Sequence, residues 1–268
     1  MLVCTLGDLL LDVIVRLDTR LAPGDDAVAA TTLAPGGQAA NVAAWAKELG
    51  ADARIVAVQA DDDAGAIVRR ELASRGVDVR GPRGERTGVV VSLVQPDGDR
   101  TMASDRGSAP DLRAEAIEAE WLTCDALHLS GYSLLGGAIT EAAQRAAALA
   151  HEHGARVSVD LSSWTHVQRL GARMRDALAQ VEPDIVFGNE REWDAIGTVE
   201  TPTRVVKRGP RGIVVDGEEH DAVPVTAVDS TGAGDALAAG FIVGGTHFAL
   251  ETAARCVAQI GAMPPLKR

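Results

Sequence analysis

The sequence predicts a three-layer α/β fold, in which helices cover both faces of a mostly parallel sheet. A chain of 268 residues is long enough to bury a large core. Short β-branched runs alternate with Ala-rich segments of helical length, which is typical of parallel sheets covered by helices. Hydrophobic residues make up 46% of the chain but aromatic residues only 3%, so we expect a core of Ala, Val, Leu and Ile.

The expected elements follow one another in a single domain over residues 1–268. Hydrophobic periodicity and end signals place them as follows. Strands are predicted at residues 2–6, 54–58, 126–129, 156–160, 184–187, 204–207 and 212–215. Helices are predicted at residues 41–49, 64–75, 139–151, 171–180, 234–243 and 250–260.

Two stretches, residues 12–33 and 83–106, interrupt this alternation. Residues 87–94 alternate apolar and polar side chains, and Pro96-Asp97-Gly98-Asp99 is typical of a hairpin turn. We expect the two stretches to form a small antiparallel lid on the main domain.

Charge and cysteine content exclude several classes of partner and location. A formal net charge of −12 opposes binding to the phosphate backbones of nucleic acids. Three cysteines without CxxC spacing favour reduced thiols. The N-terminus begins with an apolar strand-like run rather than a basic leader, and no window reaches the ~18 apolar residues of a membrane span. We therefore expect a cytoplasmic protein without nucleic-acid or membrane partners.

A glycine-rich turn precedes the predicted helix 234–243. Small residues at 232–234 leave backbone N–H groups free at a helix N-terminus, which is an anion site. Asp235 follows beside it and could accept a proton from an attacking hydroxyl. The helix N-terminus should lower the pKa of this carboxylate and weaken it as a base, although a loose phosphoryl-transfer transition state needs the proton removed only late. Alternatively, Asp229 or Ser230 caps the helix and the glycines form an ordinary turn.

Two other nucleotide-binding motifs are absent from the sequence. There is no G-x-x-x-x-G-K-[ST] P-loop. The pair Gly232-x-Gly234 lacks the third glycine of a dinucleotide fingerprint, because Leu237 stands at that position.

Two motifs carry a resemblance to a known family. Asp229-Ser-Thr-Gly-Ala-Gly-Asp235 resembles the C-terminal signature of the ribokinase-like, or phosphofructokinase-B type, carbohydrate kinases, D-[TS]-[TV]-G-[AC]-G-D. Gly36-Gly37-Gln38-Ala39-Ala40-Asn41 resembles their N-terminal signature, a Gly-Gly pair followed four residues later by Asn. The resemblance covers essentially the whole chain. It implies a ribokinase-like α/β/α fold with a β-sheet lid, and ATP-dependent phosphorylation of a sugar hydroxyl with Asp235 as the catalytic base.

The resemblance also implies an acceptor site formed by Asp12, Gly37 and Asn41. The glycine allows close backbone approach to a polyol, and Asn41 offers both a donor and an acceptor to vicinal hydroxyls. Asp12 is aligned with an acidic residue at the end of the family's first strand, and its carboxylate could accept hydrogen bonds from two hydroxyls. Asp8 is the alternative carboxylate. Asn41 could instead cap its helix.

For the nucleotide, the resemblance implies a magnesium motif in Asn189-Glu-Arg-Glu192. Mg²⁺ retains water and prefers oxygen ligands, so Glu192 is expected to bind the ion through a water molecule. Asn189 is expected to contribute to the same magnesium site. The two residues could also form a capping box.

Two glycine turns complete the expected nucleotide site. Lys207-Arg208-Gly209 resembles the turn along the ATP phosphates, so Lys207 and Gly209 are assigned to nucleotide binding, although the two basic residues could be solvated surface charges. The resemblance also assigns Gly232 and Gly234 to nucleotide binding. Together with Ala233 they are expected to form the anion hole for the transferred phosphoryl group.

Three segments depart from the family pattern. Ala60 replaces a glycine before Asp-Asp, so the acidic residues 61–63 predict a helix cap rather than a metal site. Residues 160–164 read Asp-Leu-Ser-Ser-Trp, where fructokinase-like and ketodeoxygluconate-kinase-like members show Asp-Pro-Asn followed by Arg. Few residues follow Gly261-Ala-Met-Pro264 to form a monovalent-cation loop, which leaves K⁺ dependence open.

The sequence leaves the identity of the phosphate acceptor and the oligomeric state open. A sugar is the expected acceptor, and an adenosine- or pseudouridine-type nucleoside is an alternative acceptor that the scarce aromatic residues disfavour. An alternative to the enzyme is a catalytically silent protein that binds a sugar. Arg106, His128, Ser130 and Tyr132 could contact the substrate or serve packing and solvation only. The oligomeric state stays open: many members of the family dimerise by pairing their lid sheets, and an exposed lid edge would permit a homodimer here.

Overall fold

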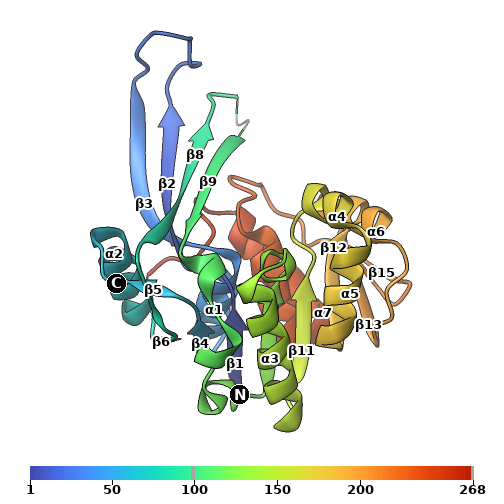
Figure 1. The fold of residues 1–268 in the computed structure, drawn as a ribbon. Helices are drawn as coiled ribbons and strands as arrows, with labels where there is room; N and C mark the ends of the chain where they lie inside the picture. The colour runs from blue at the N-terminus through green and yellow to red at the C-terminus, as the bar shows by residue number, and fades with distance from the viewer. Residues whose placement is uncertain (98–99, 267–268) are drawn as a thin grey trace.

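The main sheet of the protein has helices on both faces, and a separate lid sheet rises from one end of it (Figure 1). This arrangement, seen in a computed structural model that describes residues 1–97 and 100–266, confirms the predicted α/β class with a small β lid.

Within the described residues, the main sheet has nine strands in the order β15-β14-β13-β12-β11-β10-β1-β4-β6. The strands are β1 (Leu2–Leu6), β4 (Asp52–Val56), β6 (Val77–Arg80), β10 (Ala126–Ser130), β11 (Arg156–Asp160), β12 (Ile185–Asn189), β13 (Thr203–Lys207), β14 (Ile213–Val215) and β15 (Glu218–His220). Those from β6 to β13 pair in parallel, whereas β14 and β15 pair antiparallel at one edge. The carboxyl ends of the parallel strands therefore meet along one edge of the sheet.

All seven expected strands are present, with ends that shift by no more than two residues. The expectation missed β6 and β15. Both are short and rich in charged residues, so neither shows the apolar run that marks a buried parallel strand.

Helices and short turns cover the sheet. The α-helices are α1 (Gln38–Glu48), α2 (Asp63–Ser74), α3 (Ala138–Glu152), α4 (Trp164–Leu170), α5 (Ala172–Val181), α6 (Glu190–Ile196) and α7 (Ala233–Val257). The 3₁₀ helices are η1 (Ala109–Asp111), η2 (Ala114–Ala116), η3 (Ala119–Leu122), η4 (Gly131–Leu134) and η5 (Gly209–Arg211), and a two-stranded ribbon joins β5 (Gln59–Ala60) to β7 (Arg83–Gly84). Helix α4 was not expected, and α6 was indicated only by the capping-box alternative for Asn189 and Glu192, because seven residues are too few to show helical periodicity.

Helix α7 combines the two helices predicted at 234–243 and 250–260. The break between them is a kink at Gly245, whose φ of 78° is not helical, and the helix ends at Val257 rather than at residue 260. Contrary to the sequence-based expectation, this helix is long and apolar enough to cross a membrane by length and composition. Half of its most apolar window is buried, and its side chains join α1 in one core cluster, as in the core helix of a globular domain.

In the part of the chain that the structure describes, the lid is a four-stranded sheet in the order β3-β2-β8-β9. Its strands are β2 (Leu10–Leu17), β3 (Ala29–Gly36), β8 (Thr87–Val94) and β9 (Arg100–Gly107). The predicted antiparallel pairing is wrong at the centre, where β2 and β8 run parallel because the whole α1–β7 segment separates them in the chain. The predicted hairpin turn reaches Gly98 and Asp99, which lie outside the described residues.

Candidate active site

The glycine turn before α7 has the conformation of an anion site. Gly232 is the N-cap of α7 with φ 75°, and a Cβ atom there would come within 2.6 Å of Ala262. Neither Asp229 nor Ser230 caps the helix, so that alternative is wrong. The Asp229 carboxylate instead accepts hydrogen bonds from Thr231 N and Gly261 N, both at 2.9 Å. These bonds fix the turn so that backbone N–H groups are held at the helix N-terminus.

Asp235 lies in the first turn of α7 and meets Asn41 of α1. Asn41 Nδ2 donates a hydrogen bond to Asp235 Oδ2 at 2.7 Å, and each side chain is only 6% exposed. The capping alternative for Asn41 is wrong, because Gly37 is the N-cap of α1. The oxygen of the same amide, Asn41 Oδ1, is buried without a partner among the described residues. A buried acceptor of this kind needs a donor, and a substrate hydroxyl would supply one.

Burial sets the protonation of Asp235. Desolvation raises the pKa of its carboxyl to about 7, against the hydrogen bond from Asn41, which lowers it. The expectation that the helix N-terminus would lower this pKa is therefore wrong in its net sign, because desolvation is the larger effect. A carboxylate with a pKa near neutral is well matched to act as a general base.

Lys207, at the end of β13, lies beside the anion turn. Its Nζ donates to both oxygens of Asp160, at 2.6 and 2.8 Å, and stands 3.4 Å from where a Cβ on Gly234 would lie. The side chain is only 16% exposed, so it is not a solvated surface charge. Burial alone would lower the pKa of Lys207, but Asp160, Glu192 and Asp235 together raise it and keep the ammonium charged.

Asp160 was not among the expected site residues. Its position as the last residue of a buried strand is the signal that could have revealed it. Ser162, two residues later, has φ 68°, a conformation that Asn tolerates better than Ser.

Asn189 and Glu192 form the capping box of α6. Asn189 Oδ1 accepts from Glu192 N at 2.9 Å, and Glu192 Oε2 accepts from Asn189 N at 2.7 Å. Burial raises the pKa of Glu192. Within the described residues, no group of three or more His, Cys, Asp or Glu could hold a metal ion directly. The pair therefore fits a cation held through water and phosphate oxygens.

The residues predicted to bind the acceptor lie on the lid and at the start of α1. Asp12 lies within lid strand β2 and not at the end of the first strand, which corrects the expected position. Its carboxylate packs against Gly36, where a Cβ would come within 2.1 Å of Asp12 Oδ1. Burial raises the pKa of Asp12 to about 6, and Arg100 opposes this shift. Gly37 has φ 94° and comes so close to Asp8 that a Cβ would lie 2.1 Å from its carbonyl oxygen.

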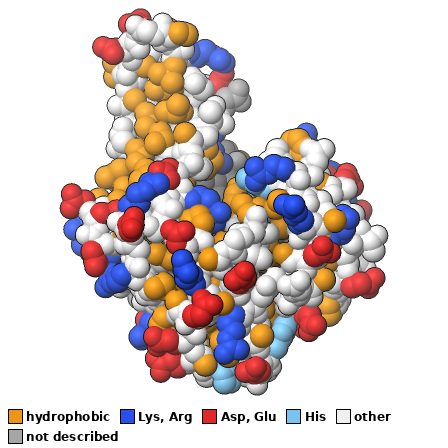
Figure 2. Space-filling view, in the orientation of Figure 1, with side chains coloured by type: hydrophobic (Ala, Val, Ile, Leu, Met, Phe, Trp, Pro, Cys, Tyr) orange, Lys and Arg blue, Asp and Glu red, His pale blue; other side chains and the backbone are white. Residues whose placement is uncertain are grey.

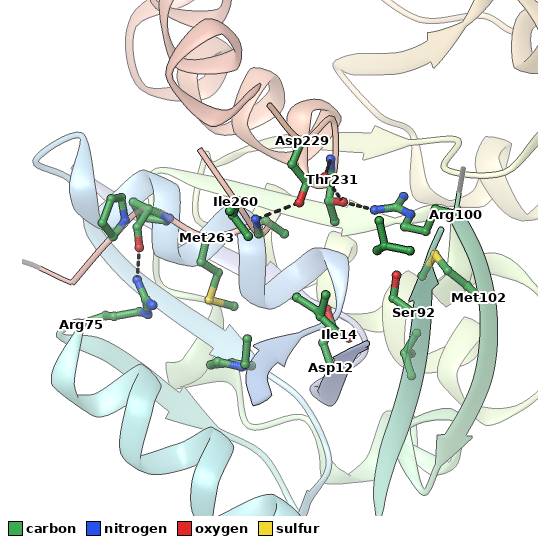
Figure 3. Close-up of a pocket in the computed structure, with 18 residues that line it drawn as sticks. Asp12, Ile14, Arg75, Ser92, Arg100, Met102, Asp229, Thr231, Ile260 and Met263 are labelled. Carbon is green, nitrogen blue, oxygen red and sulfur yellow. Dashed lines mark hydrogen bonds between the residues drawn. The ribbon is translucent and has the colours of Figure 1, made fainter. Parts of the chain in front are cut away.

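Two cavities flank the glycine turn at residues 229–234. The first, about 180 Å³, lies between the lid and the segment after α7, and Asp12, Arg100, Asp229 and Thr231 line it (Figure 3). The second, about 510 Å³, lies on the other side of the turn and is mostly apolar. It is lined by Lys207, Gly209, Pro210, Gly212, Ala222, Val223, Pro224, Val225, Ala227, Ser230, Ala233, Gly234, Leu237, Leu250, Ala253, Ala254 and Val257.

The comparisons with known proteins agree with this geometry. Residues 1–264 match the family model of the pfkB family carbohydrate kinases. The chain belongs to this family. It is 34% identical to the ATP-dependent ribose-1-phosphate kinase of Halopiger xanaduensis over 91% of the chain and 86% of the relative. It is 30% identical to a fructokinase of Escherichia coli, over 93% and 86%.

Solved structures show the same fold for this pfkB kinase. Adenosine kinase from Sinorhizobium meliloti superimposes with a TM-score of 0.83 at 26% identity, covering 98% of this chain and 95% of that one. A putative ribokinase II from E. coli, without ligand, gives a TM-score of 0.86 at 24% identity over 99% and 96%. The predicted ribokinase-like fold and carbohydrate kinase activity are therefore confirmed.

Arg100 contacts the glycine turn before α7, which the motifs did not indicate. It begins lid strand β9, and its guanidinium donates to the Thr231 hydroxyl in that turn (Figure 3). The contact joins residues 131 positions apart in the chain. Only the fold reveals it.

The sequence left open whether His128 and Arg106 contact the substrate, and the structure gives both of them partners within the protein. His128 is a core residue: it is 1% exposed, its Nδ1 lies 2.9 Å from Ser158 Oγ, and burial lowers its pKa to about 4, so its ring is neutral. Arg106 binds both oxygens of Asp8 at 2.6 and 2.7 Å, which occupies the alternative acceptor carboxylate.

Two further polar residues lie on the acceptor side of the pfkB kinase. Ser130 Oγ donates to Gln38 Oε1 at 2.5 Å, next to the acceptor turn. The Tyr132 ring packs edge-on against His166, with centroids 5.5 Å apart. Away from the site, Asp62 caps α2 by accepting from Gly65 N at 2.8 Å, as expected for the acidic cluster 61–63.

Proposed function

We propose that the protein transfers the γ-phosphoryl group of ATP to a sugar hydroxyl, with Asp235 as the base. The observation that carries this proposal is the contact between Asn41 and Asp235, in which a buried carboxylate is held beside an unpartnered amide oxygen. The hydroxyl would donate to Asn41 Oδ1 on binding. Its proton would pass to Asp235 Oδ1, because Asn41 already occupies Oδ2.

The acceptor would lie between the lid and the start of α1. Asp12 would accept hydrogen bonds from vicinal hydroxyls, and Gly37 would let the backbone approach the sugar closely. Two relatives support a sugar, since their names give ribose 1-phosphate and fructose as acceptors.

ATP would lie along the other side of the turn. The mostly apolar cavity of about 510 Å³ suits an adenine base, and Gly209 and Lys207 at one end of it would follow the phosphates. The amides of 232–234 would stabilise charge on the transferring phosphoryl group, and the Lys207 ammonium would neutralise part of it.

Magnesium would bind on the phosphate side, near Asn189 and Glu192. A solved relative, the putative ribokinase II of E. coli at 25% identity, contains ATP and Mg²⁺. The ion would neutralise charge on the β- and γ-phosphate oxygens. The capping box already uses one oxygen of each side chain, so these residues would hold the ion's water shell. Dependence on K⁺ stays an open prediction.

The lid would also join two copies of the chain. Side chains alternate along its strands, and the register places Val13, Leu33 and Val91 together on the face away from Asp12. Leu33 is 47% exposed, and Figure 2 shows hydrophobic side chains gathered along the lid. Val13 and Val91 are half-buried, and Val13 packs against the core of the body, so the exposed apolar part of this face lies around Leu33. That part favours pairing with a second lid. A cytoplasmic location is proposed on the three free cysteines.

A coupled assay for ADP release, run with Mg-ATP and a panel of acceptors, tests the function. The panel should contain free pentoses and hexoses, their phosphates, and nucleosides. We expect turnover with one or more sugars or sugar phosphates. Turnover with nucleosides alone would replace the sugar assignment, and sugar binding by calorimetry without ADP release would show a silent binding protein.

A further inference from the structure

Basic side chains continue from the Gly37 turn toward helix α4. Arg106, near the end of lid strand β9, donates from Nε and Nη2 to the Asp8 carboxylate, at 2.6 and 2.7 Å. Asp8 packs against Gly37, because a Cβ on that glycine would lie 2.1 Å from the Asp8 carbonyl oxygen. Only Asp8 therefore separates the Arg106 guanidinium from the turn that would approach the acceptor.

Asp8 fixes the orientation of the Arg106 guanidinium and leaves part of it free. Nη2 also donates to Tyr132 O at 3.1 Å, whereas Nη1 makes no hydrogen bond within residues 1–97 and 100–266. The Arg106 side chain is 23% exposed, so a ligand can reach it. A guanidinium that is held at one edge, with donors free at another, is prepared to bind an anion.

Tyr132 connects Arg106 to two further basic residues. The guanidinium lies 5.9 Å from the centroid of the Tyr132 ring, which packs edge-on against His166 of α4 at 5.5 Å. Arg169 follows His166 by three positions, so the two are neighbours on the helix surface. Figure 2 shows Lys, Arg and His side chains along the edge of the hollow between the lid and the α4 side of the body.

The charges of this cluster are unequal. Asp8 offsets Arg106, but the exposed Arg169 forms no ion pair with any residue that the structure describes. His166 Nδ1 lies 2.9 Å from Ser163 Oγ, and when that hydroxyl donates, the proton on His166 Nε2 is available to a ligand. Burial and the two arginines lower the pKa of His166, so its ring is neutral at pH 7. One positive charge is left in excess, in a protein of net charge −12.

We propose that the acceptor is a phosphorylated sugar whose phosphate is held by Arg106, His166 and Arg169. The inference rests on the proposed function, which places the free hydroxyl of the same sugar at Asn41 and Asp235. Gly37 and Asn41 are one turn of α1 apart, roughly 6 Å along the helix axis, and one sugar can bridge such a span.

The number of donors favours a phosphate over a carboxylate. A carboxylate has two oxygens in one plane, which a single guanidinium can match. A phosphate has three terminal oxygens and nearly two charges, and the cluster offers three separate donors from the lid and from α4. The free sugar would leave these donors to water.

The test compares acceptors in the coupled assay for ADP release. Ribose 1-phosphate is paired with ribose and fructose 1-phosphate with fructose, and gluconate supplies a carboxylate. We expect kcat/KM for at least one phosphorylated sugar to exceed that for its free sugar by about 100-fold, because several hydrogen bonds to a charged group are gained.

Two variants locate the phosphate. Arg169→Ala and Arg106→Met should each raise the KM for the phosphorylated sugar by about 10-fold, the effect of one charged hydrogen bond, with the KM for ATP unchanged. Arg169→Ala should also leave the KM for the free sugar unchanged. Arg173→Ala is the matched control, because Arg173 is an exposed arginine of the next helix, α5, and its loss should change none of these constants.

Each outcome supports or overturns the inference. Equal efficiency with phosphorylated and free sugars, or a preference for gluconate, would overturn it while phosphoryl transfer to a sugar stands. A phosphate preference that Arg169→Ala and Arg106→Met leave unchanged would also overturn it. Arg106→Met leaves the buried Asp8 carboxylate unpaired, so its thermal unfolding is measured, and Arg169→Ala decides the matter if Arg106→Met is unfolded.

A binding measurement separates this inference from the proposed function. If no acceptor in the panel is turned over, the proposed function fails, and ribose 1-phosphate and fructose 1-phosphate are titrated into the wild type and Arg169→Ala by calorimetry. Binding that Arg169→Ala weakens about 10-fold would support a phosphate site at this cluster. No binding, or binding of equal strength in both proteins, would overturn it.

Discussion

The two walls of the acceptor site are built in different ways. On the body side, α1 and α7 pack in the core and hold Asn41 against Asp235, each 6% exposed. On the lid side, Asp12 and Arg100 stand on strands that reach into solvent, and Arg100 contacts the body through the Thr231 hydroxyl. On the proposed mechanism, the body would fix the geometry of proton transfer, and the lid would supply groups to the acceptor from outside the core.

Replacement of Asp235 by Asn should have the largest effect on catalysis. Without a base, turnover should fall by about 10²- to 10⁴-fold. The variant should be at least as stable as the wild type at pH 8, because a neutral amide avoids the cost of a buried carboxylate whose pKa is raised to about 7. Turnover, ATP binding and thermal unfolding measure these effects. A variant with full activity would remove Asp235 from the mechanism.

Glycine substitutions at the two ends of α1 test how rigid the body wall must be. Gly37 and Gly50 share a φ of 94°, but only at Gly37 would a Cβ meet another group, the Asp8 carbonyl oxygen at 2.1 Å. Gly50→Ala should cost about 1 kcal/mol of stability, the usual penalty for left-handed backbone, with normal kinetics. Gly37→Ala should cost more and raise the KM for the acceptor. Equal effects of both changes on KM would contradict an acceptor role for the Gly37 turn.

Arg100→Ala tests the lid wall. Loss of its contact with Thr231 should lower kcat by about 10-fold, in line with loss of a polar contact at a reaction centre. Its exposed side chain should leave the midpoint of thermal unfolding unchanged. Arg20→Ala is the matched control, because Arg20 pairs with Asp97 near the tip of the lid, away from the turn. Equal kcat values for Arg100→Ala and Arg20→Ala would contradict a role for the Arg100–Thr231 contact in turnover.

The sequence predicts more of the body than of the lid, and the reason is physical. Main-sheet strands are apolar runs buried on both faces, and the motifs around Gly37 and Gly232 need particular backbone shapes, so both leave local signals. Arg100 and Asp160 act through contacts across 131 and 47 positions, which no local pattern records. The net pKa of Asp235 also depends on burial, which the helix N-terminus alone does not reveal.

The central claim is that Asn41 positions Asp235 as the catalytic base through their hydrogen bond. The most direct test is the pH dependence of kcat/KM, where the expected effect is the smallest of those predicted here. Because Asp235 must be deprotonated to accept a proton, kcat/KM should rise with pH along a limb near pH 7, the value to which burial raises this pKa. Stability from this group runs in the opposite direction: it is full below the unfolded pKa of 3.8 and is lost as pH rises through about 7. In Asn41→Ala the hydrogen bond that lowers the pKa is lost, so the limb should move to higher pH. A limb near pH 4, or one that Asn41→Ala leaves in place, would contradict the account.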